Sequence, residues 1–139
     1  MRQAQHTIEL ETRGQGLYEI TAAVTEWTSG QGIETGMLNI YCRHTSASLV
    51  IQENADPDVL KDLEAFFKNT APEDLSLYTH RSEGADDMPA HIKAALTDVS
   101  INIPVAGAAP LLGTWQGIYL FEHRTAPHRR RLVLHLSGE

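Results

Sequence analysis

The chain has 139 residues, of which 42% are hydrophobic and 21% charged, and this is the profile of one folded globular domain spanning residues 1–139. Its formal net charge of −7 with histidine neutral argues against nucleic-acid binding, which depends on lysine and arginine. Because Cys42 is the only cysteine, we expect no disulfide within the chain. The sequence contains no apolar span of roughly 20 residues and no signal peptide, so we expect a cytoplasmic protein with no membrane partner.

The first half of the chain alternates in ways that predict strands. Residues 7–12 alternate polar and apolar side chains, and a short helix capped by Thr21 is expected to follow, ending at Trp27. Residues 48–52 are predicted to form an apolar strand. Residues 37–44 are predicted to form the strand before it, with one inward face made of Leu38, Ile40, Cys42 and His44. On such a face we expect Cys42 to be buried and unreactive.

Two helices are predicted in the middle of the chain. Asp56 is a good N-cap and Pro57 fits the first helical position, so a helix begins here. Its apolar positions recur at helical spacing: Val59, Leu60, Leu63, Phe66 and Phe67. Asp86 or Asp87 is expected to cap a second helix, whose apolar stripe would be Ile92, Ala95, Leu96 and Val99.

The last third predicts three more strands, at residues 100–105, 115–123 and 131–136. The basic run at residues 128–131 is typical of a solvated turn. Strands and helices do not alternate regularly, so the pattern favours a mixed α+β domain over a doubly wound parallel sheet.

Two polar clusters stand at the ends of predicted elements. The first combines His44 and three hydroxyl side chains with a downstream carboxylate and amide, a set suited to anion binding or proton transfer: Thr45, Ser46, Ser48, Glu53 and Asn54. The second spans residues 80–91 and brings Asp86, Asp87 and His91 to one helix N-terminus. A divalent metal such as Mg²⁺ or Zn²⁺ could use His44, His80 and His91 together with these carboxylates.

Two alternatives stand beside the metal hypothesis. The spacing contains no CxxC or HExxH pattern, so each histidine could instead only hydrogen-bond a neighbouring loop. A Ser-His-Asp hydrolase built from Ser46 or Ser48, His44 and Asp56 is disfavoured because no G-x-S-x-G elbow is present. Between Gly113 and Gly117, two glycines flank three further candidate residues and indicate close approach of the backbone to a strand or ligand: Thr114, Trp115 and Gln116.

With these residues in view, the chain resembles the YjbQ-like family, described as secondary thiamine-phosphate synthases. The matching stretches follow one another in family order: HTSAS at 44–48, QENADP at 52–57, EGADDMPAHIK at 83–93, LGTWQGIY at 112–119 and EHR at 122–124. The resemblance implies a single domain of packed, mostly antiparallel β-sheets with two to three helices, and a homotrimer. It also implies a transferase that condenses hydroxymethylpyrimidine diphosphate with hydroxyethylthiazole phosphate and releases pyrophosphate.

Residue roles follow from testing the two polar clusters against that activity. The expected catalytic residues are His44, His80, His91 and Glu53, and the expected metal ligands are the same histidines with Asp86 and Asp87. Arg43, Lys93 and Arg124 would contact phosphates. The full set of expected substrate-binding residues is Thr45, Ser46, Ser48, Asn54, Lys93, Thr114, Trp115, Gln116 and Arg124. The alternatives are a metal- or anion-binding module without turnover, or a phosphoester hydrolase that uses the same pocket on a small phosphorylated substrate.

Overall fold

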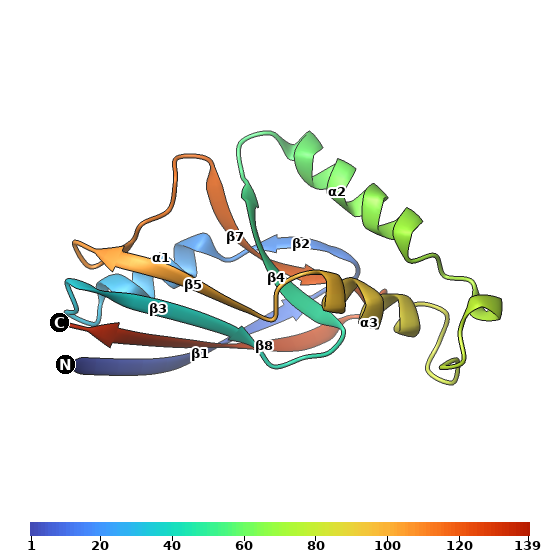
Figure 1. The fold of residues 1–139 in the computed structure, drawn as a ribbon, viewed down its shortest axis with the longest axis horizontal. Helices are drawn as coiled ribbons and strands as arrows, with labels where there is room; N and C mark the ends of the chain where they lie inside the picture. Colours follow the sequence, from blue (N-terminus) through green and yellow to red (C-terminus); the bar gives the residue numbers. More distant parts are fainter.

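Alternating apolar and polar side chains produce two antiparallel β-sheets that face each other (Figure 1). The computed structural model describes residues 1–139. The five-stranded sheet has the order β1-β8-β3-β5-β6, with β1 at Arg2–Thr12, β8 at His128–Gly138, β3 at Thr35–Cys42, β5 at Ser100–Ala106 and β6 at Ala109–Pro110. The three-stranded sheet has the order β2-β7-β4, with β2 at Gly16–Glu19, β7 at Gln116–Glu122 and β4 at Ala47–Glu53. The expected α+β domain of antiparallel sheets is confirmed.

The hydrophobic core lies between the sheets. Leu38, Ile40 and Cys42 of β3 are all buried, as their alternation predicts, and burial raises the pKa of the Cys42 thiol. Ile118 and Leu120 of β7 join the same core from the other sheet. His44, predicted to end the inward face of β3, lies beyond the strand, which ends at Cys42.

Two helices begin close to the predicted positions, but they are capped differently. In α2 (Pro57–Thr70) the Asp56 carboxylate accepts a hydrogen bond from the Asp58 N–H at 2.9 Å, which confirms the predicted N-cap. In α1 (Thr21–Ser29) the predicted cap is wrong, because Thr21 is already helical. Its hydroxyl instead donates to Glu19 and accepts the Ile118 N–H, both at 2.8 Å.

The third helix, α3 (Asp87–Leu96), reverses the predicted apolar stripe. Its buried residues are Asp87, Pro89, Ala90 and Lys93, whereas Leu96 is 58% exposed and Val99, which follows the helix, is 46% exposed. Asp86 precedes the helix, but its side chain forms no capping bond. The stripe was wrong because compensating charges from distant segments allow Asp87 to face inward.

Short elements escaped the sequence patterns. These are β2, β6 and a 3-10 helix, η1 (Leu75–Leu77). The turn between β5 and β6 places Gly107 and Ala108 at φ values of +58° and +60°, as a tight hairpin requires. Strand β8 begins at His128, so the basic run predicted as a turn belongs to a strand.

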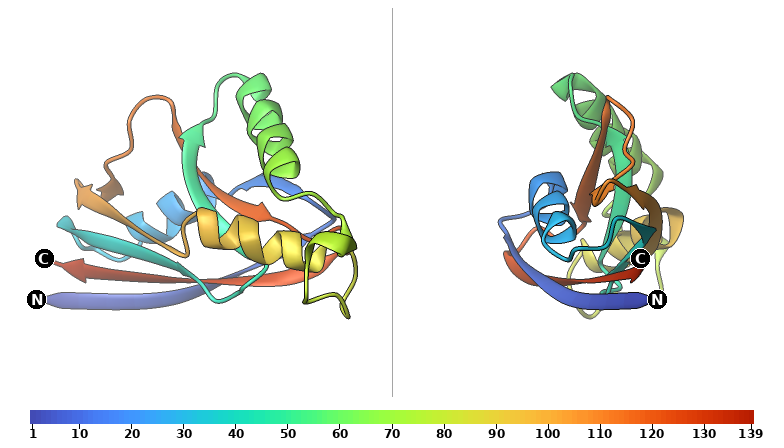
Figure 2. Two further views of the ribbon diagram at one scale, coloured as in Figure 1. Left: turned by 45° about the vertical axis from the view of Figure 1, so that its right-hand side comes forward. Right: turned by 90° about the vertical axis from the view of Figure 1, so that its left-hand side faces the viewer.

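Helix α2 stands away from the sheets at one end of the molecule, and the two termini lie together at the ends of β1 and β8 (Figure 2). No residue of α2 is fully buried, and Phe66 is 61% exposed. Phe67 makes an edge-on contact with Phe121 of β7, 5.4 Å between ring centroids. None of the helices is long and apolar enough to cross a membrane.

A buried ion pair ties the two sheets together. Arg130 of β8 donates from Nε to Glu122 of β7 at 2.8 Å, and both side chains are almost fully buried. Thr12 of β1 donates to the same carboxylate. Burial raises the pKa of Glu122, but the hydrogen bonds from Arg130 and Thr12 outweigh this and hold it below the usual value.

Replacing Arg130 with alanine leaves the Glu122 charge buried without its partner. We expect Arg130→Ala to lower the free energy of unfolding by about 3–5 kcal/mol, measured by urea titration. Arg131→Ala is the matched control, because the neighbouring Arg131 pairs with Glu9 on the exposed face. The control should cost no more than about 1 kcal/mol, and equal losses in the two variants would contradict this role of Arg130.

Candidate metal centre

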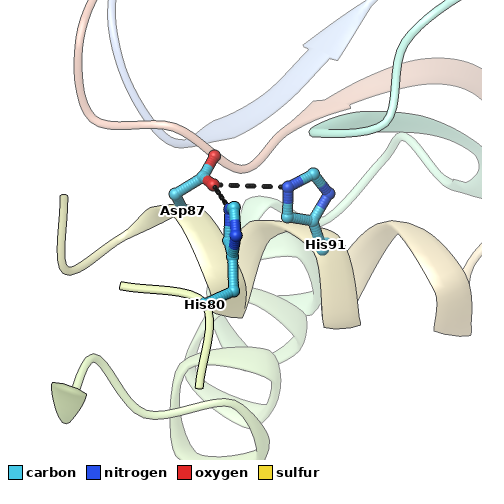
Figure 3. Close-up of side chains that lie close together, drawn as sticks. All are labelled: His80, Asp87 and His91. Carbon is cyan, nitrogen blue, oxygen red and sulfur yellow. Dashed lines mark hydrogen bonds and ion pairs between the residues drawn. The ribbon is translucent and has the colours of Figure 1, made fainter. Parts of the chain in front are cut away.

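Two histidines and one aspartate converge at the start of α3. Asp87 and His91 are four residues apart on the helix and therefore share one face. His80 reaches the same point from the segment between η1 and α3 (Figure 3). The potential ligand atoms of the three side chains all lie within 4.8 Å of one another. We call His80, Asp87 and His91 the triad.

One carboxylate oxygen is shared by both imidazoles. Asp87 Oδ2 lies 2.7 Å from His80 Nε2 and 3.3 Å from His91 Nε2. The two rings meet at 67° with centroids 5.6 Å apart. The carboxylate is buried, while the His80 and His91 side chains are 44% and 33% exposed. In the triad, the carboxylate is therefore shielded from solvent, while both imidazoles can be reached from solvent.

The hydrogen bond on the far side of His91 fixes which nitrogen is available. His91 Nδ1 lies 3.0 Å from the carbonyl oxygen of Thr45. A carbonyl only accepts, so Nδ1 carries a hydrogen, and in the neutral ring Nε2 is then a bare lone pair. That nitrogen lies 3.3 Å from Asp87 Oδ2, and two acceptors this close repel each other unless a proton or a cation lies between them. The geometry thus favours a positive charge inside the triad.

The second oxygen of Asp87 is held by Arg124. Arg124 Nη1 donates to Asp87 Oδ1 and Arg124 Nε donates to Asp86 Oδ2, both at 2.9 Å. Burial raises the pKa of Asp87, but the hydrogen bond from His80 and the charges of His91 and Arg124 outweigh it, so the pKa lies below the ordinary value. Burial likewise raises the pKa of Asp86, and the bonds from Arg124 and Thr125 reverse the effect. Asp86 therefore positions Arg124 and does not join the triad.

His44 lies beside the triad but outside it. Its Nε2 accepts the backbone N–H of Arg131 at 2.8 Å, so this nitrogen is not free to bind a metal. Burial and the charge of Arg130 lower its pKa. Thr45 supplies its carbonyl oxygen to His91, and the hydroxyl of Ser46 accepts from Arg130 Nη2 at 3.0 Å.

The remaining residues of the first polar cluster lie at the other end of β4. That strand has seven residues, which separates Ala47 from Glu53 by about 20 Å. Glu53 pairs in register with Gln116 of β7, and Asn54 donates to Glu19. Trp115 is 63% exposed. The structure thus divides the expected site, leaving Glu53, Asn54, Thr114, Trp115 and Gln116 away from the triad.

A buried Ser-His pair occurs where sequence patterns did not indicate one. Ser48 Oγ lies 2.9 Å from His123 Nε2, and both residues are buried. Burial, with the charge of Lys93 nearby, lowers the pKa of His123 to about 3. His123 Nδ1 has no hydrogen-bond partner, so no carboxylate completes a triad of the hydrolase type. The sequence analysis grouped Ser48 with the nearby His44. Ser48 and His123 are 75 residues apart in the sequence, so only the fold reveals that they are in contact.

Comparison with known proteins shows which family the whole chain resembles. The family model described as "UPF0047 protein YjbQ-like" matches residues 6–139. The UPF0047 protein sll1880 of Synechocystis is 49% identical over 99% of this chain and 94% of its own. The UPF0047 protein YjbQ of Salmonella typhimurium is 46% identical over 97% of this chain and 98% of its own.

Solved structures agree on the fold. A hypothetical protein from Aeropyrum pernix K1 has a TM-score of 0.83 at 30% identity, covering 100% of both chains. A Sulfolobus solfataricus P2 protein, described as YbjQ-like and of unknown function, has a TM-score of 0.87 at 22% identity and covers 99% of this chain and 100% of its own. At that identity the likeness concerns the fold alone.

The expected thiamine-phosphate synthase activity is contradicted by these comparisons. The relatives are named only as UPF0047 proteins, and the Sulfolobus protein is described as being of unknown function. No name among them points to thiamine chemistry, and the assignment as a transferase has no support.

Removing Arg124 should expose the energetic role of the paired aspartates. Both folded-state pKa values lie below the ordinary 3.8, so the stabilisation is present above about pH 4 and is lost as the pH falls further. We expect Arg124→Gln to lower the unfolding free energy by about 1–3 kcal/mol at neutral pH, with the difference from wild type shrinking below about pH 4. Urea titrations of both proteins, from neutral pH to below about pH 4, measure this difference in unfolding free energy.

Arg129→Gln is the matched control, because Arg129 pairs with Glu11 on the exposed surface. It should change stability by less than about 1 kcal/mol at any pH. A pH-independent loss in Arg124→Gln would contradict the proposed pairing with Asp86 and Asp87.

Proposed function

The chain belongs to the UPF0047 YjbQ-like family, and from that premise and the site geometry we propose that it is a metal-dependent enzyme whose divalent ion is held by His80, Asp87 and His91. The observation that carries the proposal is the facing pair of acceptors, His91 Nε2 and Asp87 Oδ2, 3.3 Å apart. A cation between them converts a repulsion into two ligand bonds.

Two of the ligand separations, those from each histidine to Asp87, are close to those around such an ion. Ligand atoms around a tetrahedral zinc ion, at bond lengths near 2.0–2.1 Å, lie roughly 3.3 Å apart. His91 Nε2 and Asp87 Oδ2 already have this separation. His80 Nε2 lies 2.7 Å from the carboxylate and must retreat by about half an ångström, which its exposed position allows.

The surrounding hydrogen bonds orient the proposed ligands. The Thr45 carbonyl holds His91 with Nε2 beside Asp87 Oδ2, and Arg124 occupies the other Asp87 oxygen. Metal-bound histidines and carboxylates generally have such outer partners, which fix the tautomer and the ring orientation. Thr45 and Arg124 are therefore assigned positioning roles.

The donor set favours a transition metal. Imidazole nitrogen suits zinc and related ions, whereas Mg²⁺ prefers oxygen ligands and keeps several waters. Three protein ligands leave at least one position for an outside molecule, which is the usual arrangement of catalytic zinc sites. Such an ion activates a bound water or polarises a substrate oxygen. The cytoplasmic location and the small phosphorylated substrate stay predictions.

Zinc binding tests the proposal directly. We expect the purified untagged protein to bind one Zn²⁺ per chain in calorimetry. His80→Ala, His91→Ala and Asp87→Asn should each weaken zinc binding by roughly 100-fold or more, which exceeds the loss typical of outer-shell partners. His135→Ala is the control, because His135 lies on β8 and contacts Gln5. Binding that is weakened equally by the control, or unaffected by the triad variants, would contradict the site.

Proton competition and an outside ligand provide two further readouts of the same centre. Both imidazoles must be deprotonated to bind, so affinity should fall roughly tenfold or more from about pH 8 to about pH 5.5. Co²⁺-loaded protein should change its visible spectrum on adding azide, since an open position accepts it. A spectrum that azide leaves unchanged would indicate a closed structural site and would overturn the enzymatic proposal.

We also propose the homotrimer that the family resemblance implies. The chain leaves single large apolar side chains exposed, among them Phe66 at 61% and Leu77 at 59%, which offer apolar area for an interface between copies. Light scattering should give three times the 15.4 kDa of one chain. A monomer mass at micromolar concentration would contradict it.

A further inference from the structure

A groove runs from the triad along the outer side of α3. One part of it, with a volume of about 310 Å³, is lined on the helix by His91, Ala94 and Ala95 and on the opposite wall by His44, Thr45 and Ala47. A second part of about 380 Å³ shares His44, Thr45 and Val99 with the first and continues past Cys42 to Tyr41 and Arg43. We call the two parts together the α3 groove.

Small side chains create this groove. Ala94 and Ala95 lie three and four residues after His91, so they continue the same helix face. Ala47 lies opposite at the start of β4. The His91–Thr45 hydrogen bond joins the two walls beside the triad, so His91 belongs both to the triad and to the groove. A molecule in the groove would therefore have one end beside the proposed ion.

The charge of the groove differs from that of the whole chain. The chain has 18 acidic residues and a net charge of −7, yet no acidic side chain lines either part of the groove. Arg43 lines the far part and is exposed. The arginines that form ion pairs are Arg124, Arg129, Arg130 and Arg131, so the guanidinium of Arg43 is unpaired.

His44 adds a neutral donor on the shared wall. Its Nε2 accepts the Arg131 N–H, so the neutral ring carries its hydrogen on Nδ1. Nδ1 forms no hydrogen bond within the chain, which leaves this N–H free for a ligand. The groove therefore combines an apolar floor with an N–H donor and an unpaired cation.

From this arrangement we propose that the α3 groove binds a small organic anion, a carboxylate or a phosphate monoester, with its apolar body on Ala94 and Ala95 and its anionic group beside Arg43 and His44. The body then extends toward His91. Only the assignment of this anion as substrate rests on the proposed metal-dependent function. Binding itself depends on groove residues that hold no metal.

Three six-carbon probes test the chemistry: hexanoate, hexyl phosphate and the neutral hexanol. Methyl resonances of the alanines and Val99 report binding by NMR, in metal-free and in zinc-loaded protein. At least one anion should bind at least tenfold more tightly than hexanol, and the tighter of the two identifies the headgroup. Hexanol binding as tightly as both anions would overturn the proposal.

Two variants locate the site. Arg43→Gln should weaken anion binding fivefold or more, whereas Arg13→Gln, a change at another exposed arginine without an ion pair, should not. Ala94→Leu fills the groove with a good helix former and should weaken binding tenfold or more while leaving zinc affinity unchanged. Equal binding by wild type and Arg43→Gln, or by wild type and Ala94→Leu, would overturn the proposal.

The two proposals fail separately. Anion binding that needs Arg43 and Ala94 in a protein that takes up no zinc would keep the groove and reject the metal centre. Zinc binding with no anion binding would keep the metal centre and reject the anion site in the groove. Groove methyl shifts that change with protein concentration in the absence of any probe would identify a second copy of the chain as the occupant and would overturn the anion proposal.

Discussion

The buried carboxylate of Asp87 organises the end of the molecule that contains the triad. It sits at the start of α3, with Arg124 on one oxygen and two imidazoles on the other. Burying a carboxylate without partners costs several kcal/mol, so these contacts are what allow α3 to pack where it does. Because Arg124 follows β7 and His80 precedes α3, the charge pairing also connects the helix to the sheet and to the segment before it.

The inward turn of Asp87 explains the rest of α3. A helix that buries Asp87, Pro89, Ala90 and Lys93 leaves Ala95 and Leu96 exposed and Ala94 partly buried. The orientation of α3 that buries Asp87 therefore also leaves Ala94 and Ala95 to form the apolar floor of the α3 groove. The face that α3 buries thus explains why the charged Asp87 lies inside the protein next to a mostly apolar groove on its surface.

Sequence patterns predicted the parts of the fold that depend on neighbouring residues. The alternation in β3 and the Asp56 cap are local, and both were confirmed. The buried face of α3 was mispredicted, because it depends on Arg124, 37 residues from Asp87. The Ser48–His123 pair was missed for the same reason. The separation of His44 from the triad depends on the Arg131 backbone in β8, which no spacing in the sequence reveals.

His91 links the chemistry of the triad to the contents of the groove. Its Nδ1 hydrogen is committed to Thr45, so any change in charge at the ring takes place at Nε2, inside the triad. Thr45 also forms part of the groove wall. A ligand that shifts Thr45 would therefore alter the hydrogen bond that orients Nε2. Thr45 therefore lies between the two features: its carbonyl oxygen accepts the hydrogen bond of His91, and the same residue lines the groove.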